Sequence, residues 1–112
     1  MAIPETVKAI GKSAFYEDEA LVTAALSNSI ETIGERAFFG CNALEDITIP
    51  NKLVIIEESA FHHCDMIESL EIPDSVTTIV NRAFNLCKGL EYITLGKGVK
   101  SIGNYAFYGI NL

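Results

Sequence analysis

Residues 72–94 have the sequence IPDSVTTIVNRAFNLCKGLEYIT, and the segment before them, residues 49–71, has the sequence IPNKLVIIEESAFHHCDMIESLE. Both begin with Ile-Pro and carry an Ala-Phe pair and a Cys at the same places. The same spacing of 23 residues runs through the whole chain without insertion or deletion. The repeated columns are Phe15, Phe38, Phe61, Phe84 and Phe107; Ala14, Ala37, Ala60, Ala83 and Ala106; Ile10, Ile33, Ile56, Ile79 and Ile102; Val7, Ile30, Leu53, Val76 and Val99; and Ile3, Leu26, Ile49, Ile72 and Leu95.

A fixed repeat of this length predicts a solenoid. One unit is too short to bury its own apolar face, whereas stacked units bury each other's faces in a continuous core. Each unit should advance the chain by one strand spacing, roughly 4.8 Å, so that five units extend over roughly 25 Å. We expect one domain over residues 1–112, made of the units 3–25, 26–48, 49–71, 72–94 and 95–112, with both end units partial.

Within each unit the sequence predicts two extended segments and a helical turn. Residues 44–50 alternate apolar and polar side chains and end at a proline, which is typical of a short strand with Asp46 and Thr48 on its outer face. Residues 76–79 are rich in β-branched side chains and form the second extended segment. Residues 81–87 are predicted to form a single turn of helix, whose small alanine lets neighbouring coils approach and whose phenylalanine fills the interior.

Composition restricts the classes of partner. The 112 residues are 49% hydrophobic and 21% charged, which is globular rather than disordered. Asp and Glu number 15 against 8 Lys and Arg, and the net charge of −7 argues against nucleic acid or an anionic membrane as a partner. No segment is apolar enough for membrane insertion. The first residues lack the basic start and apolar core of a secretory signal, which leaves a cytoplasmic location open.

The repeated pattern Leu-x-x-Ile-x-Ile-Pro-x-x-Val-x-x-Ile-Gly-x-x-Ala-Phe-x-x-Cys resembles the BspA-type (Treponema-type) leucine-rich repeat. The resemblance covers essentially the whole chain and implies a right-handed leucine-rich-repeat superhelix. In that solenoid, short parallel strands line one face, with short extended pieces and helical turns elsewhere. Many members are surface proteins of bacteria and parasitic protists that bind host or matrix proteins. The resemblance therefore implies a cell-surface or secreted protein-binding module with a role in adhesion.

The two end units depart from the pattern. The first has Asp18 where later units have Cys, and Ala24 where they have Ile or Leu, which indicates partial capping. The chain also begins and ends within a repeat. We interpret both ends either as cut from a longer array or as surfaces that pair with another copy. In the second case, end residues such as Ile3 and Leu112 would mediate an end-to-end homo-oligomer.

Cysteine and histidine give little sign of chemistry. Cys41, Cys64 and Cys87 occupy one column, where free cysteine is expected to act as a small buried hydrophobe. A disulfide between neighbouring coils is sterically conceivable and would leave the third thiol unpaired. Residues 62–65, His-His-Cys-Asp, are consecutive and point in different directions, so we do not expect them to converge on a metal ion. No metal and no cofactor is predicted.

The candidate binding surface is an acidic edge beside the predicted strand. Glu45, Glu68 and Glu91 recur at one position, and Asp46 and Glu71 lie on the outer face of the same sheet. Such a surface favours a basic protein partner, although an ordinary solvated surface is the alternative. Small hydroxyl side chains and one tyrosine complete a plausible contact face. The predicted binding residues are Glu45, Asp46, Thr48, Glu68, Ser69, Glu71, Glu91, Tyr92 and Thr94.

No catalytic arrangement emerges from the sequence. Gly96 and Gly98 flank a lysine but lack the other residues of a phosphate-binding loop, so they indicate a turn. We therefore predict a non-catalytic protein-binding module rather than an enzyme. The alternatives are an intracellular regulatory scaffold and a self-assembling structural repeat protein, in which open ends stack.

Overall fold

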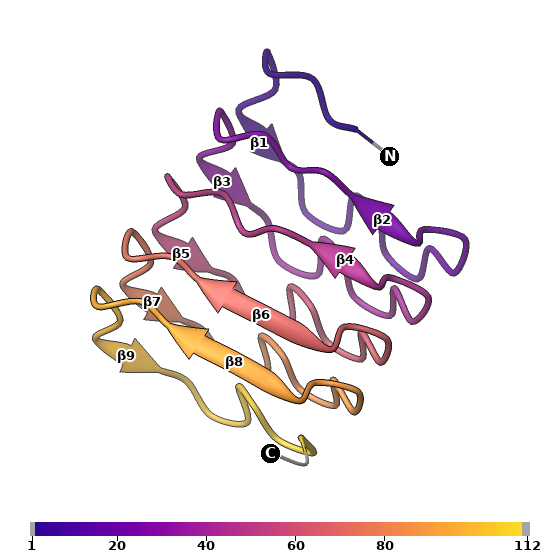
Figure 1. Ribbon diagram of the computed structural model, residues 1–112, viewed down its shortest axis with the longest axis vertical. Helices are drawn as coiled ribbons and strands as arrows, with labels where there is room; N and C mark the ends of the chain where they lie inside the picture. The colour runs from indigo at the N-terminus through magenta and orange to yellow at the C-terminus, as the bar shows by residue number, and fades with distance from the viewer. Residues whose placement is uncertain (1, 111–112) are drawn as a thin grey trace.

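The computed structural model describes residues 2–110, which form a stack of coils with the two termini at opposite ends (Figure 1). Leu112, one of the predicted end-contact residues, lies outside the described residues. We number the coils 1 to 5 after the repeats that form them, 3–25, 26–48, 49–71, 72–94 and 95–110. The first column of strands contains β2 (Thr23–Ala24), β4 (Asp46–Ile47), β6 (Ser69–Ile72) and β8 (Tyr92–Leu95). The second column contains β1 (Ala9–Ile10), β3 (Thr32–Ile33), β5 (Ile55–Ile56), β7 (Thr78–Ile79) and β9 (Ser101–Ile102).

All the paired strands are parallel and join residues one repeat apart. In the first column β2 pairs with β4 and β6 with β8, and the longest register runs from Ser69–Tyr92 to Ile72–Leu95. In the second column β1 pairs with β3, and β5, β7 and β9 form a three-stranded sheet. The expected solenoid of short parallel strands is confirmed, because equivalent residues of successive units lie beside one another.

The core consists of the repeated apolar columns. Phe38, Phe61 and Phe84 have no exposed surface, and their rings stack with centroids 5.2 and 5.3 Å apart. Each alanine of the Ala-Phe pairs in coils 2 to 4 is also fully buried, so that the backbones of neighbouring coils can approach. The sequence prediction of the core is therefore confirmed for the middle of the stack, where each coil is covered on both sides.

The predicted helical turn is wrong. Residues 81–86 form consecutive turns instead, because Arg82 and Leu86 adopt left-handed backbone conformations with φ of 59° and 61°. Every coil repeats this pair of left-handed residues four positions apart, which no α-helix allows. The left-handed residues are Ser13, Glu17, Arg36, Gly40, Ser59, His63, Arg82, Leu86, Tyr105 and Gly109.

The turn segment, residues 81–86 in coil 4 and the equivalent residues of the other coils, directs every second N–H group towards the next coil. Arg82, Phe84 and Leu86 donate to carbonyl oxygens of coil 5 at 3.0, 2.8 and 2.7 Å, whereas Ala83 and Asn85 donate within their own coil. A helix would direct these N–H groups along its own axis rather than towards the next coil, so stacking and helix formation compete for the same donors. The stacked arrangement recurs at all four junctions between coils. We call this set of bonds the turn ladder.

The strands separate at one junction, between coils 2 and 3. Within the described residues, β4 does not pair with β6, and β3 does not pair with β5. The turn ladder continues across the same junction, since Phe38 donates to Ala60 at 2.8 Å and Gly40 to His62 at 2.8 Å. The two coils are therefore joined along the turn segment and open along both strand columns.

Coil 3 has larger side chains than its neighbouring coils at three contact positions, Lys52, Glu57 and Met66. The Ser29 hydroxyl donates to the carbonyl of Val7 at 2.8 Å, and the Ser75 hydroxyl donates to that of Leu53 at 2.6 Å. Lys52 occupies the equivalent place in coil 3 and cannot make this short bond. The hydroxyl bond is thus missing where β3 and β5 separate. It is also missing where β7 and β9 pair, but there Gly98 leaves no bulky side chain in its place.

The position of Met66 precedes the first strand column. Gly89 approaches coil 3 so closely that a Cβ there would lie 2.2 Å from the carbonyl oxygen of Asp65, and β6 and β8 pair over four residues beside it. Ala43 occupies this place beside the short β2–β4 pair, and Met66 occupies it at the open junction. The number of paired strand residues therefore falls as the side chain at this contact becomes larger, from four beside glycine to two beside alanine and none beside methionine.

We expect Phe61→Ala to lower the free energy of unfolding by about 3–5 kcal/mol, because it removes the middle ring of the buried stack. Urea denaturation followed by circular dichroism measures the change. Tyr92→Ala, which removes an aromatic ring that is 69% exposed, is the matched control and should change the stability little. A loss below about 1 kcal/mol for Phe61→Ala would refute the core assignment.

We expect Lys52→Ser to raise the free energy of unfolding by about 1 kcal/mol, by restoring the hydroxyl bond between coils 2 and 3.

In the unsubstituted protein, the amide protons of Val54 and Glu57 should exchange with solvent faster than those of Thr77 and Val80. The latter two donate to coil 3 at 2.8 and 2.9 Å. Hydrogen exchange followed by NMR measures the exchange rates of both pairs of amide protons. Equal protection of the two pairs in the unsubstituted protein would show that the strands are not open.

Candidate functional site

All nine predicted binding residues lie on or next to the first strand column, and all of them are exposed. The alternation in β6 places Ser69 and Glu71 outward, while Leu70 and Ile72 face the core. Residues in register extend the same face across coil 4, since Tyr92 lies beside Ser69 and Thr94 beside Glu71. The strand face is therefore continuous from β6 to β8 and interrupted between β4 and β6.

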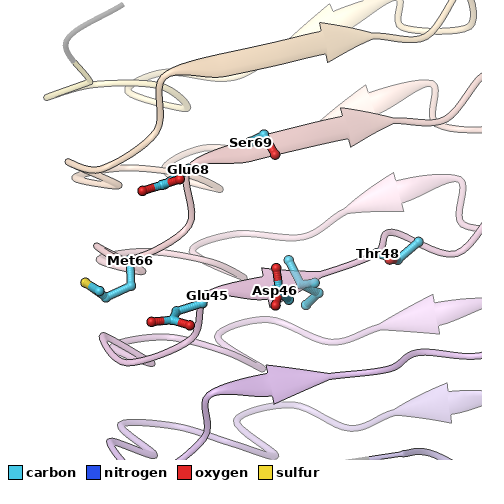
Figure 2. Close-up of a pocket in the computed structure, with 7 residues that line it drawn as sticks. Glu45, Asp46, Thr48, Met66, Glu68 and Ser69 are labelled. Carbon is cyan, nitrogen blue, oxygen red and sulfur yellow. The ribbon is translucent and has the colours of Figure 1, made fainter.

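The interruption forms a groove of about 380 Å³ between coils 2 and 3. Figure 2 shows Glu45, Glu68 and Met66 at one end of this groove and Thr48 towards the other. We call it the acidic groove. It is lined by Glu45, Asp46, Ile47, Thr48, Met66, Glu68 and Ser69.

A second hollow, of about 810 Å³, continues along the strand face. It brings Thr48 and Ser69 together with Glu71 and Thr94, and it ends at Lys97 on the loop after β8. Seven of the nine predicted residues therefore line one of the two hollows. Glu91 and Tyr92 line neither hollow and stand on the open surface of coil 4.

The acidic groove has no counter-charge of its own. Among the described residues, the ion pairs join Lys12 to Glu35, Arg36 to Glu58 and His63 to Asp65, and each lies along the turn segment. The carboxylates at the groove thus face solvent without a basic neighbour within ion-pair distance in residues 2–110. The carboxylates of the groove, in contrast to those already in ion pairs, therefore remain available to a basic group of another molecule.

The separated strands also leave backbone groups for a partner. At the next junction the N–H groups of Glu91 and Tyr92 donate to the carbonyl of Glu68, at 2.8 and 3.1 Å. The equivalent donors of coil 3, Glu68 and Ser69, make no such bond to Glu45 within the described residues. The groove thus presents both backbone donors and carboxylates. Sequence reasoning missed it, although Lys52 and Met66 already depart from the small residues of their columns.

The cysteine column is buried and reduced. Each thiol donates to the carbonyl of a phenylalanine in the preceding coil, from Cys41 to Phe15 at 3.0 Å and from Cys87 to Phe61 at 3.0 Å. Burial raises the pKa of the Cys41 thiol from 9.0 to about 11 and that of Cys87 to about 12. The pKa of Cys64 is raised as well, chiefly by burial. Nucleophilic chemistry needs a lowered thiol pKa, so this column acts in packing.

The histidines lie along an aromatic stack on the turn segment. Phe39 stacks between Tyr16 and His62, with ring centroids 4.9 and 4.5 Å away. Burial lowers the pKa of His62, and the nearby charges of His63 and Arg82 act in the same direction. Within residues 2–110, no group of three His, Cys, Asp or Glu side chains is placed to hold a metal ion. Nor does this part of the chain contain a helix long and apolar enough to span a bilayer.

Parallel strands in register at a 23-residue repeat, with the Phe and Cys columns inside, define a leucine-rich-repeat solenoid. The family model of the BspA type leucine rich repeat region matches residues 1–112 with six copies. The chain therefore belongs to the BspA-type leucine-rich-repeat family. No curated protein sequence matches it.

Three solved bacterial structures are similar to the chain. A leucine-rich repeat protein of T. pallidum has a TM-score of 0.92 at 32% identity, with 96% of this chain and 53% of that protein covered. A leucine-rich cell surface protein of Faecalibacterium prausnitzii has a TM-score of 0.80 at 28% identity, with coverages of 93% and 31%. A leucine-rich repeat protein of Bacteroides ovatus has a TM-score of 0.70 at 27% identity, with 100% of this chain and 39% of that protein covered. The chain spans about half or less of each of these proteins.

We expect the three thiols to resist alkylation by iodoacetamide at pH 8 in the folded protein and to react fully in urea, because their raised pKa values keep them protonated. Mass spectrometry counts the modified residues.

Above about pH 9, the thiols of the unfolded chain ionise while those of the folded chain stay neutral, so the free energy of unfolding should fall as pH rises. Cys87→Ala should reduce this slope. Rapid native alkylation at pH 8 would contradict the burial of the column.

Proposed function

We propose that the chain is a non-catalytic protein-binding module that recognises a basic segment of another protein through its strand face. The observation that carries the proposal is the acidic groove, where Glu45, Asp46 and Glu68 line one hollow without a basic partner among the described residues. The family supports a recognition role, since solenoids commonly bind along extended faces.

The groove has features suited to a lysine or arginine side chain. Carboxylates at its edge attract the charged head, while Met66 and Ile47 offer apolar surface to the aliphatic stem. Among the described residues β4 has no strand partner on the side of coil 3, so its carbonyl oxygens there supply further acceptors for N–H groups. A guanidinium with five donors matches this set of acceptors better than a single ammonium does. The proposed partner therefore presents arginine or lysine in an exposed segment.

The remaining strand face provides a flat contact area beside the groove. Tyr92 is 69% exposed, and its neighbour in register is the small Ser69. Tyrosine is one of the residue types enriched at the few interface positions that carry most of the binding energy. We place Tyr92 as the anchor next to the charged end of the interface. Glu91 and Thr94 flank it on coil 4.

We propose the bacterial cell surface as the setting, with adhesion as the role. The similar protein of Faecalibacterium prausnitzii is described as a leucine-rich cell surface protein, and this supports the assignment by likeness. The acidic face suits such a role, since electrostatic attraction speeds the encounter with a basic partner.

The test measures binding of a labelled oligoarginine peptide by fluorescence anisotropy at low and high salt. We expect Glu68→Lys to weaken binding about threefold to tenfold at low salt, because it reverses one carboxylate in the groove. The melting temperature should hardly change, since Glu68 is exposed. Glu31→Lys is the matched control, because it makes the same charge change on the second strand column.

Equal weakening by Glu68→Lys and Glu31→Lys would show that only net charge matters and would refute the groove. Tyr92→Ala tests the contact face separately. It should weaken capture of a folded basic protein, such as lysozyme, more than it weakens binding of the short peptide. No difference between the two probes would remove Tyr92 from the interface.

A further inference from the structure

The second strand column carries large apolar side chains at its outward positions in coil 3. Val54 and Ile55 are 48% and 39% exposed there. Every other coil has polar or small side chains at the equivalent positions. These are Lys8, Glu31, Thr77 and Lys100 in the column of Val54, and Ala9, Thr32, Thr78 and Ser101 in the column of Ile55. Coil 3 is covered by coils 2 and 4, so its two apolar side chains face outward from the side of the stack.

A notch of about 180 Å³ lies beside these two side chains, between coils 2 and 3. We call it the apolar notch, and it is lined by Glu31, Thr32, Ile33, Val54, Ile55 and Glu57. A protein cavity of roughly 150 Å³ with an aliphatic lining takes up a benzene molecule, so a space of this size accepts one aliphatic side chain. The apolar notch shares no residue with the acidic groove, and it lies on the other strand column.

The backbone beside the apolar notch lacks the bonds that join the other coils. On the second strand column, Gly34 donates to Ile10 at 2.9 Å and Val80 donates to Ile56 at 2.9 Å. The equivalent N–H group of Glu57 makes no such bond among the described residues, and β3 does not pair with β5 there. An extended segment carries N–H and carbonyl groups at regular intervals, so it can bond to backbone groups left free in this way.

A carboxylate borders the exposed apolar surface. Glu57 stands where coils 2 and 5 have Gly34 and Gly103, and no ion pair involves it within residues 2–110. Ile55 and Glu57 are alternate residues at the end of β5, so their side chains share one face at about 7 Å along the strand. The apolar notch therefore combines two exposed apolar side chains with an unpaired carboxylate two residues further on.

We propose that the apolar notch binds an extended segment of another protein. In this segment a leucine or valine side chain packs against Val54 and Ile55, and a lysine or arginine two residues away lies beside Glu57. The alternate spacing selects an extended conformation, because side chains two residues apart point in different directions from a helix. This contact is independent of the proposed binding at the acidic groove, since an oligoarginine peptide has no leucine or valine to fill the notch.

A second copy of this chain suits the apolar notch poorly. A two-fold contact would set the Glu31 and Glu57 carboxylates of the two copies against one another, and each copy carries a net charge of −7. The exposed apolar area is also limited to two side chains, whereas a specific interface between folded proteins buries about 800 Å² on each partner. Charge and size therefore favour a short, basic, extended segment.

The test titrates the isotope-labelled chain with an acetylated and amidated peptide, Ser-Gly-Leu-Ser-Lys-Gly-Ser, and follows the amide signals by NMR. We expect the largest shifts at Val54, Ile55 and Glu57. Replacing the leucine by serine should weaken binding about threefold to tenfold, because the burial of apolar surface is lost. Moving the lysine next to the leucine should also weaken binding, because adjacent side chains of an extended chain point to opposite faces.

Two variants test the protein side of the contact. Val54→Thr and Ile55→Thr introduce the residue that coil 4 has at the same positions, Thr77 and Thr78, so the fold should be retained. Each variant should weaken binding of the peptide about threefold to tenfold. Val22→Thr is the matched control, because Val22 is 45% exposed next to β2 and does not line the notch. The control should leave the affinity unchanged.

The titration is repeated in Glu68→Lys, which removes a carboxylate of the acidic groove and should change binding to the notch little. Equal affinity for the peptides with and without leucine would overturn the inference. Equal weakening by Val54→Thr and Val22→Thr would do the same, as would shifts centred on Glu45 and Glu68. A dimer in sedimentation velocity that Val54→Thr disrupts would show that a second copy occupies the notch, and would also refute the proposed segment.

Discussion

At all four junctions between coils, three N–H groups of the turn segment donate to carbonyls of the next coil, even where the strands separate. The strand columns vary from four paired residues to none, so they do not set the repeat. Each turn segment needs its donors at alternate positions, and two left-handed residues place them there. Such residues cost roughly 1–2 kcal/mol each when they are not glycine, a cost that stacking must offset. A missing or extra residue would misalign all three bonds, which explains the constant 23-residue spacing.

The sequence predicted the fold and core through side-chain burial, and it failed where backbone hydrogen bonding decides. The Phe, Ala and Ile columns are buried in coils 2 to 4 as expected, because periodic apolar residues report stacking directly. The helix expected over residues 81–87 is absent. Neither Arg82 nor Leu86 belongs to a type that favours a left-handed backbone, so residue identity within this segment gave no signal of the turns. The signal lies in Gly40 and Gly109, which share the column of Leu86. Tertiary stacking overrides local preference here, since the same donors serve either structure.

The candidate site was predictable in its residues but not in its shape. Alternation in β6 was enough to place Ser69 and Glu71 outward. The acidic groove depends instead on a failure of two strands to pair, which involves contacts between coils. Lys52 and Met66 are conspicuous once each column is compared, yet Val80 shows why one larger side chain is not decisive. It replaces a column glycine and still donates to Ile56 at 2.9 Å. Separation of both strand columns coincides with three larger side chains in one coil, those of Lys52, Glu57 and Met66.

The regular stacking contacts and the proposed binding surface therefore occupy different positions in this solenoid. Stacking restricts the buried columns and the turn ladder, because a change there affects two neighbouring coils at once. Exposed strand positions carry no such restriction, and there the chain places carboxylates that weaken stacking slightly, since like charges at strand spacing repel. The weakest strand contact and the acidic groove coincide at the junction of coils 2 and 3. A basic partner bound there would relieve the repulsion and bridge the open strands, so binding and stability of that junction should be coupled.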